Sequence, residues 1–309
     1  MTLATSTAPG VAQAPPAPRR RRGRGLYRTL APYLFVTPFL AFFVAFGVYP
    51  MLFALQLSFT DWRGAGTAQW VGWDNYLYLL QNPAFWSSLA TSGALWLMTV
   101  PVQILVGTIA AVILNNTLMR GRGLARSFLL LPFVTPLVAM AQVWIITFDQ
   151  NHGAVNAFLG LFGLPDIGWL TTTVWAKPTI ALLFLWKTTG FAVIILLAGL
   201  QAIPGDVYEA AALDGASRAR QLWEITLPLL RRTTAFLVVM QTLAVFQMFA
   251  EPFMLTQGGP YGSTTTAGYN LYKYIRVSDL GTGAANSFLL VVIVVLLSLA
   301  TIRFLRPKD

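Results

Sequence analysis

Six long apolar stretches alternate with polar or mixed segments along this chain. About 20 apolar residues in a helix, with a rise of roughly 1.5 Å each, cross the hydrocarbon of a bilayer, and every stretch reaches that length. The pattern therefore predicts an all-α membrane protein with six transmembrane helices. The predicted spans are about 31–59, 88–115, 127–149, 178–202, 232–256 and 284–305.

The first 30 residues differ from the rest of the chain. They are rich in Pro, Ala, Gly, Ser and Thr and end in a cluster of arginines, which is typical of a disordered basic tail at a membrane surface. A signal peptide also begins with basic residues, but here the apolar run is long and no small-residue cleavage site closes it. We expect a retained tail over 1–30 and one six-span domain over 31–309.

Lysine and arginine predict the orientation in the membrane. Most of the 21 basic residues lie in the tail, at 120–126, at 218–232 and near the C-terminus. Because cytoplasmic loops carry the excess of Lys and Arg, both termini and the loop 203–231 are expected in the cytoplasm. The Trp- and Tyr-rich segment between the first two spans is typical of an aromatic belt at the outer interface.

Composition narrows the class of function. The 309 residues are 56% hydrophobic and 10% charged, whereas soluble domains carry about 25% charged residues, so lipid is the expected solvent. The sequence has no cysteine and one histidine, His152, which argues against disulfides and metal centres. The net charge is +10, but the basic residues that produce it flank the predicted spans and are not gathered on one folded face, so they do not indicate nucleic-acid binding. With no phosphate-binding Gly-rich loop and only scattered acids, we expect no enzyme and no ATP bound by this chain.

The loop between the fourth and fifth stretches carries the most informative local chemistry. Residues 202–232 read AIPGDVYEAAALDGASRARQLWEITLPLLRR. Asp206 is placed to cap a short helix, with Glu209 at the spacing that reaches back to a cap. Gly215 allows a left-handed elbow, and Ser217 can cap a second short helix. Local chemistry alone leaves two hypotheses, an amphipathic loop on the lipid surface or a rigid protruding element.

The same loop resembles a known motif. EAAALDGA with its I-x-LP ending is similar to the EAA loop of permease subunits in ABC-type importers, which implies a coupling helix that docks into a cleft on a cytoplasmic ATPase. The alanines permit close approach, Glu209 offers a charge to a basic partner, and Pro228 is expected to end the second helix. The matching positions are Glu209, Ala210, Ala211, Asp214, Gly215, Ala216, Ile225, Leu227 and Pro228.

Other segments extend the resemblance over about residues 33–305. YPMLFALQLSFTDW, LNNTLMRGRGLARSFLLLPFVTP and MLTQGGPYGSTTTAGYNLY are similar to the sugar-importing branch of that family. The TxGGP loop of the maltose- or glycerol-phosphate-type subunit is matched here by residues 256–260. One departure is Ala250, which stands where members often carry Asp, with Glu251 one residue later.

The resemblance implies a multi-subunit transporter of which this chain is one part. It implies a type I ABC importer fold for a mono- or oligosaccharide or a related polyol phosphate, in a bacterial or archaeal plasma membrane. The implied partners are a second similar permease, two copies of an ATPase that bind ATP and Mg²⁺, an extracellular sugar-binding protein and membrane lipid. A homodimer of this chain remains an alternative to the permease pair. No cofactor is expected on this chain.

Five intramembrane residues are candidates for the substrate pathway. Lys187 needs a polar partner, because a charge at mid-membrane depth costs roughly 2.5–3.5 kcal/mol; it faces either the pore or a carbonyl or carboxylate of a neighbouring helix. Glu251 either faces the translocation cavity or reaches the membrane interface. Gln247, one turn before it in the predicted fifth span, is expected to share its face and could hydrogen-bond a sugar hydroxyl. Trp186 and Phe249 could stack on a sugar ring or serve only in packing.

Two hypotheses from other classes remain. An ion-coupled secondary carrier acting alone predicts an internal repeat and intramembrane acids. We see no convincing repeat, and only Glu251 lies near a span interior. A membrane scaffold that recruits a partner through the EAA-like loop would need activity measurements to distinguish it from a transporter.

Overall fold

The computed structural model describes residues 25–115 and 121–305, so the predicted tail lies outside the described residues up to residue 24. The chain divides into two compact units, one ending at Phe53 and one beginning at Ala54. In the first unit the backbone is helical from Gly25, six residues before the expected start of the first span. α1 (Gly25–Phe43) leads through a π-helical turn, η1 (Val44–Val48), into α2 (Tyr49–Leu57).

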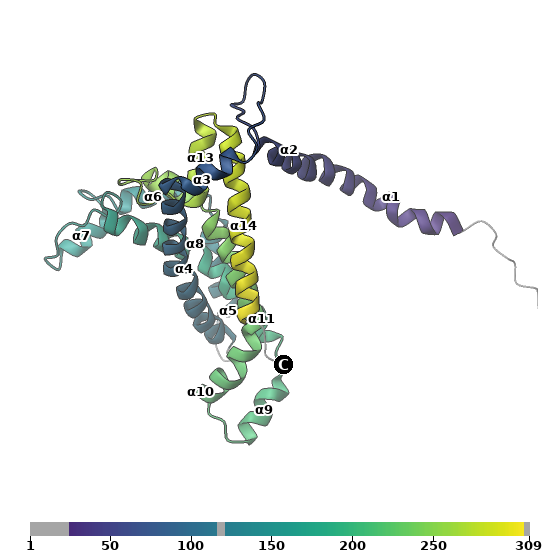
Figure 1. The fold of residues 1–309 in the computed structure, drawn as a ribbon. Coiled ribbons are helices and arrows are strands. Elements are labelled where there is room, and N and C mark those ends of the chain that lie inside the picture. The colour runs from purple at the N-terminus through teal and green to yellow at the C-terminus, as the bar shows by residue number, and fades with distance from the viewer. Residues whose placement is uncertain (1–24, 116–120, 306–309) are drawn as a thin grey trace, which may run out of the picture. The chain divides into compact units, whose positions relative to one another are not determined.

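The second unit is helical throughout, apart from turns and one isolated bridge between Thr60 and Trp70 in its described part (Figure 1). Its helices are α3 (Asp74–Gln81), α4 (Pro83–Asn115), α5 (Arg122–Val134), α6 (Leu137–Thr147), α7 (Ala154–Gly160), α8 (Thr173–Gln201), α9 (Gly205–Leu213), α10 (Arg218–Gln221), η2 (Leu222–Thr226), α11 (Leu227–Phe246), α12 (Ala250–Thr256), α13 (Ala267–Arg276) and α14 (Leu280–Leu305).

Five helical stretches of the described residues are long and apolar enough to cross a membrane, and six if a bent pair counts as one span. The bent pair is α5 and α6, which meet at 91° and replace the straight third span that the hydropathy predicted. Thr135 at the bend is extended, with ψ 135°. The cause is Pro136, because a proline ring disfavours helical geometry in the residue before it.

The fifth span was predicted to run to residue 256, and that prediction is wrong. α11 ends at Phe246, and α12 begins at Ala250 after a short break. Two features favour the break: Pro252 has no N–H to continue a helical ladder, and the Thr266 hydroxyl donates to the Met248 carbonyl. Gln247 and Glu251 therefore do not share the face of one continuous helix.

The centre of the second unit is the packing of α8 against α4, α5 and α11. Leu183, Leu196 and Val193 of α8 are fully buried there. Small residues let the backbones approach, as is usual between transmembrane helices. At Gly190 a methyl group would lie 1.7 Å from the Leu129 carbonyl oxygen of α5.

We predict that Gly190→Ala destabilises the fold by about 1–3 kcal/mol, the usual cost of forcing an extra carbon into a packed interface. Thermal unfolding of the purified protein in detergent measures this as a lower midpoint. The matched control is Gly93→Ala, because a methyl group at Gly93 in α4 meets nothing within 4 Å. An equal midpoint for the two variants would contradict the predicted close approach of α5 and α8.

Candidate coupling loop and intramembrane polar site

The first helix of the loop, α9, starts two residues earlier than predicted. It begins at Gly205 with Pro204 in the cap position, so the prediction that Asp206 caps it is wrong. Pro204 fixes the φ angle of the chain entering the helix. Asp206 lies instead in the first turn, where its negative charge favours the positive end of the helix dipole.

The elbow after α9 is confirmed at the predicted glycine. Gly215 has φ +82°, and the amide of Ala216 donates to the Ala211 carbonyl at 2.9 Å. The amide of Gly215 donates to the Ala212 carbonyl at 3.0 Å. This pair of bonds is the Schellman motif, which ends a helix at a left-handed residue. The LDGA sequence thus fixes the direction in which the chain leaves α9.

The second helix begins as predicted and ends differently. The Ser217 hydroxyl accepts from the Arg220 amide at 3.3 Å, which confirms the cap. The Arg220 side chain donates to Glu224 at 2.8 Å, and the pKa of Arg220 is raised by this bond. Pro228 does not end the helix: α10 continues through η2 into α11, and Pro228 lies in the first turn of α11. The π-helical turn η2 directly precedes this proline, and in it the Leu227 amide donates to the Leu222 carbonyl, so the regular i→i−4 ladder is already interrupted where Pro228 lacks an N–H.

The two faces of α9 have different surroundings. The Tyr208 hydroxyl bonds the Thr226 hydroxyl at 3.1 Å and ties α9 to the start of α11. Glu209 and Ala210 are exposed on the other side. Leu213 is 90% exposed, one turn after Glu209. The sequence analysis did not single out Leu213, because its exposure depends on how the loop folds and no local sequence pattern shows it.

Lys187 and Glu251 come together inside the helix bundle. The Lys187 ammonium of α8 lies 4.0 Å from the Glu251 carboxylate of α12, and both side chains are largely buried. This ion pair joins α8 to α12, the short helix that follows the break after α11. Lys187 thus has a carboxylate partner on a neighbouring helix.

A second polar pair lies beside Lys187. Gln103 of α4 is fully buried and donates to the Thr188 hydroxyl at 2.9 Å. Its side-chain oxygen has no partner among the described residues. Sequence reasoning missed Gln103, although a glutamine in an apolar span is itself a signal, because a polar group in hydrocarbon requires a partner.

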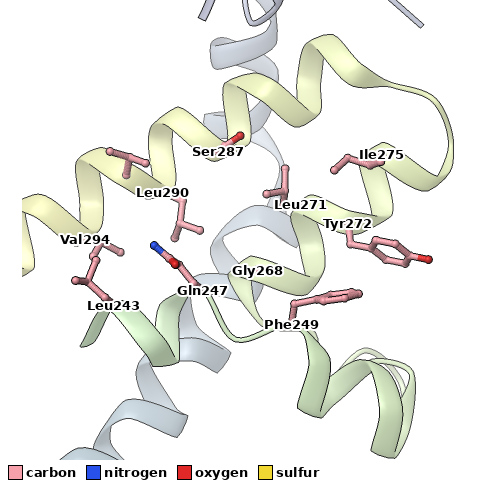
Figure 2. Close-up of a pocket in the computed structure, with 11 residues that line it drawn as sticks. Leu243, Gln247, Phe249, Gly268, Leu271, Tyr272, Ile275, Ser287, Leu290 and Val294 are labelled. Atoms are coloured by element: carbon pink, nitrogen blue, oxygen red, sulfur yellow. The ribbon is translucent and has the colours of Figure 1, made fainter. Parts of the chain in front are cut away.

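Gln247 and Phe249 line a separate cavity of about 600 Å³ between the end of α11, α13 and α14. Figure 2 shows both side chains with Tyr272 of α13 near Phe249. The rings of Phe249 and Tyr272 have centroids 4.7 Å apart. The cavity therefore offers one amide and two aromatic faces among mostly apolar walls.

Trp186 belongs neither to the Lys187–Glu251 pair nor to the cavity lined by Gln247 and Phe249. It is 48% exposed, its ring lies 6.0 Å from that of Trp144, and it lines a smaller hollow between α4, α5 and α8. The five predicted pathway residues thus divide into an ion pair, a pair at one cavity and a single tryptophan elsewhere.

The TxGGP loop is held in one conformation. Gln257 and Gly258 both have left-handed φ angles, 51° and 80°. The Tyr269 hydroxyl donates to the Gln257 carbonyl at 3.0 Å. A methyl group on Gly258 would lie 2.4 Å from the Tyr269 ring, so only glycine fits this position.

These features define a class of protein. The described residues form a multi-pass helical membrane protein with buried polar groups between its helices and a rigid, exposed loop at the end of α8. Among residues 25–115 and 121–305, no three histidine, aspartate or glutamate side chains are grouped to hold a metal ion.

Within that class, the chain belongs to the family of binding-protein-dependent transport system inner membrane components, whose model matches residues 103–306. It is 34% identical to the trehalose/maltose transport system permease of Thermococcus litoralis, covering 85% of this chain and 89% of that protein. It is also 34% identical to the lactose transport system permease of Rhizobium radiobacter over 86% of this chain and 91% of that protein. These relatives identify an ABC permease of the carbohydrate-uptake branch.

The fold has a solved counterpart. A chain of a bacterial ABC transporter involved in the import of the acidic polysaccharide alginate superposes with a TM-score of 0.81. The match covers 92% of this chain and 97% of that chain at 23% sequence identity. The likeness confirms the fold of an ABC importer permease.

Proposed function

We propose that this chain is one of two permease subunits of a type I, ATP-driven, binding-protein-dependent importer of a mono- or oligosaccharide or a related polyol phosphate. The observation that carries the proposal is the EAA loop. Its elbow is fixed by backbone hydrogen bonds, and it presents Glu209 and Leu213 to solvent. Relatives named for trehalose/maltose, lactose and arabinooligosaccharides support a carbohydrate as the cargo.

The loop is the coupling element in this proposal. ATP and Mg²⁺ bind to two copies of a separate ATPase, and this chain carries no cofactor. The surface around Glu209, Ala210 and Leu213 docks into the ATPase, with Asp214, Gly215 and Ala216 setting the direction of the elbow. Because Tyr208 ties α9 to the start of α11, a push on α9 is transmitted to the fifth span. Such rigid-body transmission switches the spans between inward- and outward-open states.

The pathway residues take different roles. Gln247 and Phe249, with Tyr272, offer an amide and aromatic faces of the kind that bind sugar hydroxyls and C–H groups. Lys187 and Glu251 hold α8 against α12 and so position the outer end of the fifth span. Trp186 remains a candidate contact in the hollow between α4, α5 and α8. The sugar arrives from an extracellular binding protein; one solved neighbour is a transporter in complex with its ligand-bound periplasmic protein.

The orientation follows from charge. Both termini and the EAA loop face the cytoplasm of a bacterial or archaeal cell, as the distribution of Lys and Arg predicts. The ATPase contact therefore lies on the side where ATP is available.

Purification of the chain from membranes in a mild detergent tests the proposal. We expect a second permease and an ATPase to co-purify, and the reconstituted complex to take up labelled sugar when ATP and a sugar-loaded binding protein are supplied. Maltose, trehalose and lactose form the first panel of probes. Recovery of this chain alone, with uptake driven by an ion gradient, would overturn the proposal in favour of an independent carrier.

A further inference from the structure

The segment 153–165, between α6 and α8, presents an apolar surface that no helix of the second unit covers. It contains α7, and no charged residue occurs in it. Helical spacing puts Ala154, Phe158 and Leu161 on one face. Leu161 is 80% exposed and Phe162 68% exposed, and Phe158 and Leu164 are more than half exposed.

The shape of this segment is fixed by its own hydrogen bonds. Gly163 has φ +71°, and the amide of Leu164 donates to the Leu159 carbonyl at 3.2 Å. This closes α7 in a Schellman turn, as at the elbow of the coupling loop. The rings of Phe158 and Phe162 meet edge to face at 5.3 Å. The apolar side chains are therefore held outward by a folded turn.

Asn156, on the opposite face of α7, attaches the segment to the rest of the protein. Its side chain is buried and fully bonded. The amide nitrogen donates to the carbonyls of Gln150 and Ile167, both at 2.9 Å. The amide oxygen accepts from the Ile167 amide at 3.3 Å and from the Trp169 indole at 2.8 Å.

These bonds also fix the depth of the segment along α8. The Trp169 carbonyl accepts from the Thr179 hydroxyl at 3.1 Å. Thr179 is six residues into α8, about 9 Å from its first residue at the helical rise. The Trp169 ring packs against Phe148 at 5.6 Å and against Trp175 at 5.0 Å. Such aromatic clusters mark the boundary between lipid and water.

We propose that the 153–165 segment lies in the lipid–water boundary at the end of α8 opposite the coupling loop, with Phe158, Leu161 and Phe162 among lipid acyl chains. Exposure of this face to water is unfavourable, because its large apolar side chains form a contiguous patch. Lipid fits it, because the turn satisfies its backbone hydrogen bonds internally and presents no charge to the bilayer. The segment then acts as a rigid anchor that holds the start of α8 at one depth.

Site-directed spin labelling tests the proposal, and the absence of cysteine in this sequence makes single labels clean. Leu161→Cys and Phe158→Cys are each labelled with a nitroxide in the full chain, purified with the chains that accompany it. The complex is placed in nanodiscs of phosphatidylcholine and phosphatidylglycerol. The wild-type chain, treated identically, gives the background from cysteines of other chains. Collision with oxygen reports lipid, and collision with a water-soluble nickel chelate reports water.

We expect labels at 158 and 161 to collide more with oxygen than with nickel. The control is His152→Cys in the turn before α7, where the side chain is 93% exposed and the order should reverse. Accessibility of 161 to nickel equal to that of 152 would overturn the proposal and show a surface in water. Protection of 158 and 161 from both reagents would also overturn it, because another protein chain, such as the second permease, would then cover the segment.

Discussion

Replacing Gly215 with valine is expected to abolish sugar uptake while the protein still inserts into the membrane. The elbow requires φ +82°, and an L-residue pays roughly 1–2 kcal/mol for that geometry, a β-branched residue more. With valine at this position, the chain relieves the strain by adopting another backbone conformation. The direction in which the chain leaves α9 then changes. Because the proposed coupling depends on a fixed angle between α9 and α11, we expect the ATPase contact and uptake to be lost together.

Two variants make this test specific to backbone geometry. Gly215→Asn should retain part of the uptake, because asparagine tolerates the left-handed region. Gly205→Ala, in the first turn of α9, should retain nearly all, since Gly205 has an ordinary φ and a methyl group there meets nothing within 4 Å. Membrane fractionation checks insertion, and co-purification checks the ATPase contact. Normal uptake by Gly215→Val would show that this loop does not couple.

A charge reversal in the same loop should have a comparable effect. Glu209→Lys leaves the elbow and its hydrogen bonds intact, since the Glu209 side chain is exposed. It puts a positive charge where we propose that a basic surface of the ATPase docks, so we expect loss of both co-purification and uptake. Retention of both would limit the coupling contact to apolar residues such as Leu213.

The sequence was sufficient for the features that depend on local chemistry. Hydropathy located the apolar helices, although it missed the bend between α5 and α6 and the early end of α11. Gly215 and Ser217 act as predicted because a left-handed elbow and a helix cap are decided within a few residues. Proline residues alone did not predict where a helix bends. Pro136 coincides with a sharp bend, whereas α4 and α8 continue as helices through Pro101 and Pro178. Neighbouring helices decide which of these effects a proline has.

Long-range pairs were beyond sequence reasoning. Lys187 and Glu251 are 64 positions apart, and only the break at residues 247–249 lets α12 turn the carboxylate toward α8. The same break separates Gln247 from Glu251, which a continuous helix would have kept on one face. The Thr266 hydroxyl, from the segment after α12, donates to the Met248 carbonyl within the break. No local sequence pattern predicts that contact.

The buried pair itself supports the last prediction. Glu251→Lys would put two positive charges about 4 Å apart, which at an effective dielectric constant of about 20 repel by about 4 kcal/mol. We expect a sharp fall in the yield of folded protein, measured by size-exclusion chromatography in detergent. Lys187→Glu should behave alike, because it opposes two carboxylates in the same place.

The double variant Lys187→Glu with Glu251→Lys restores opposite charges and should recover most of the folded yield, since the two positions exchange one favourable contact for its reverse. Lys187→Met is the neutral comparison: it removes the charge without adding repulsion. It should leave the ATPase association intact, because the coupling loop begins 16 residues further along the chain, at residue 203. If the double variant folds no better than either single charge reversal, the two side chains do not stabilise each other, and α12 is held against α8 by its apolar contacts. If the double variant folds and binds the ATPase but does not take up sugar, the position of the lysine matters to transport as well as to packing.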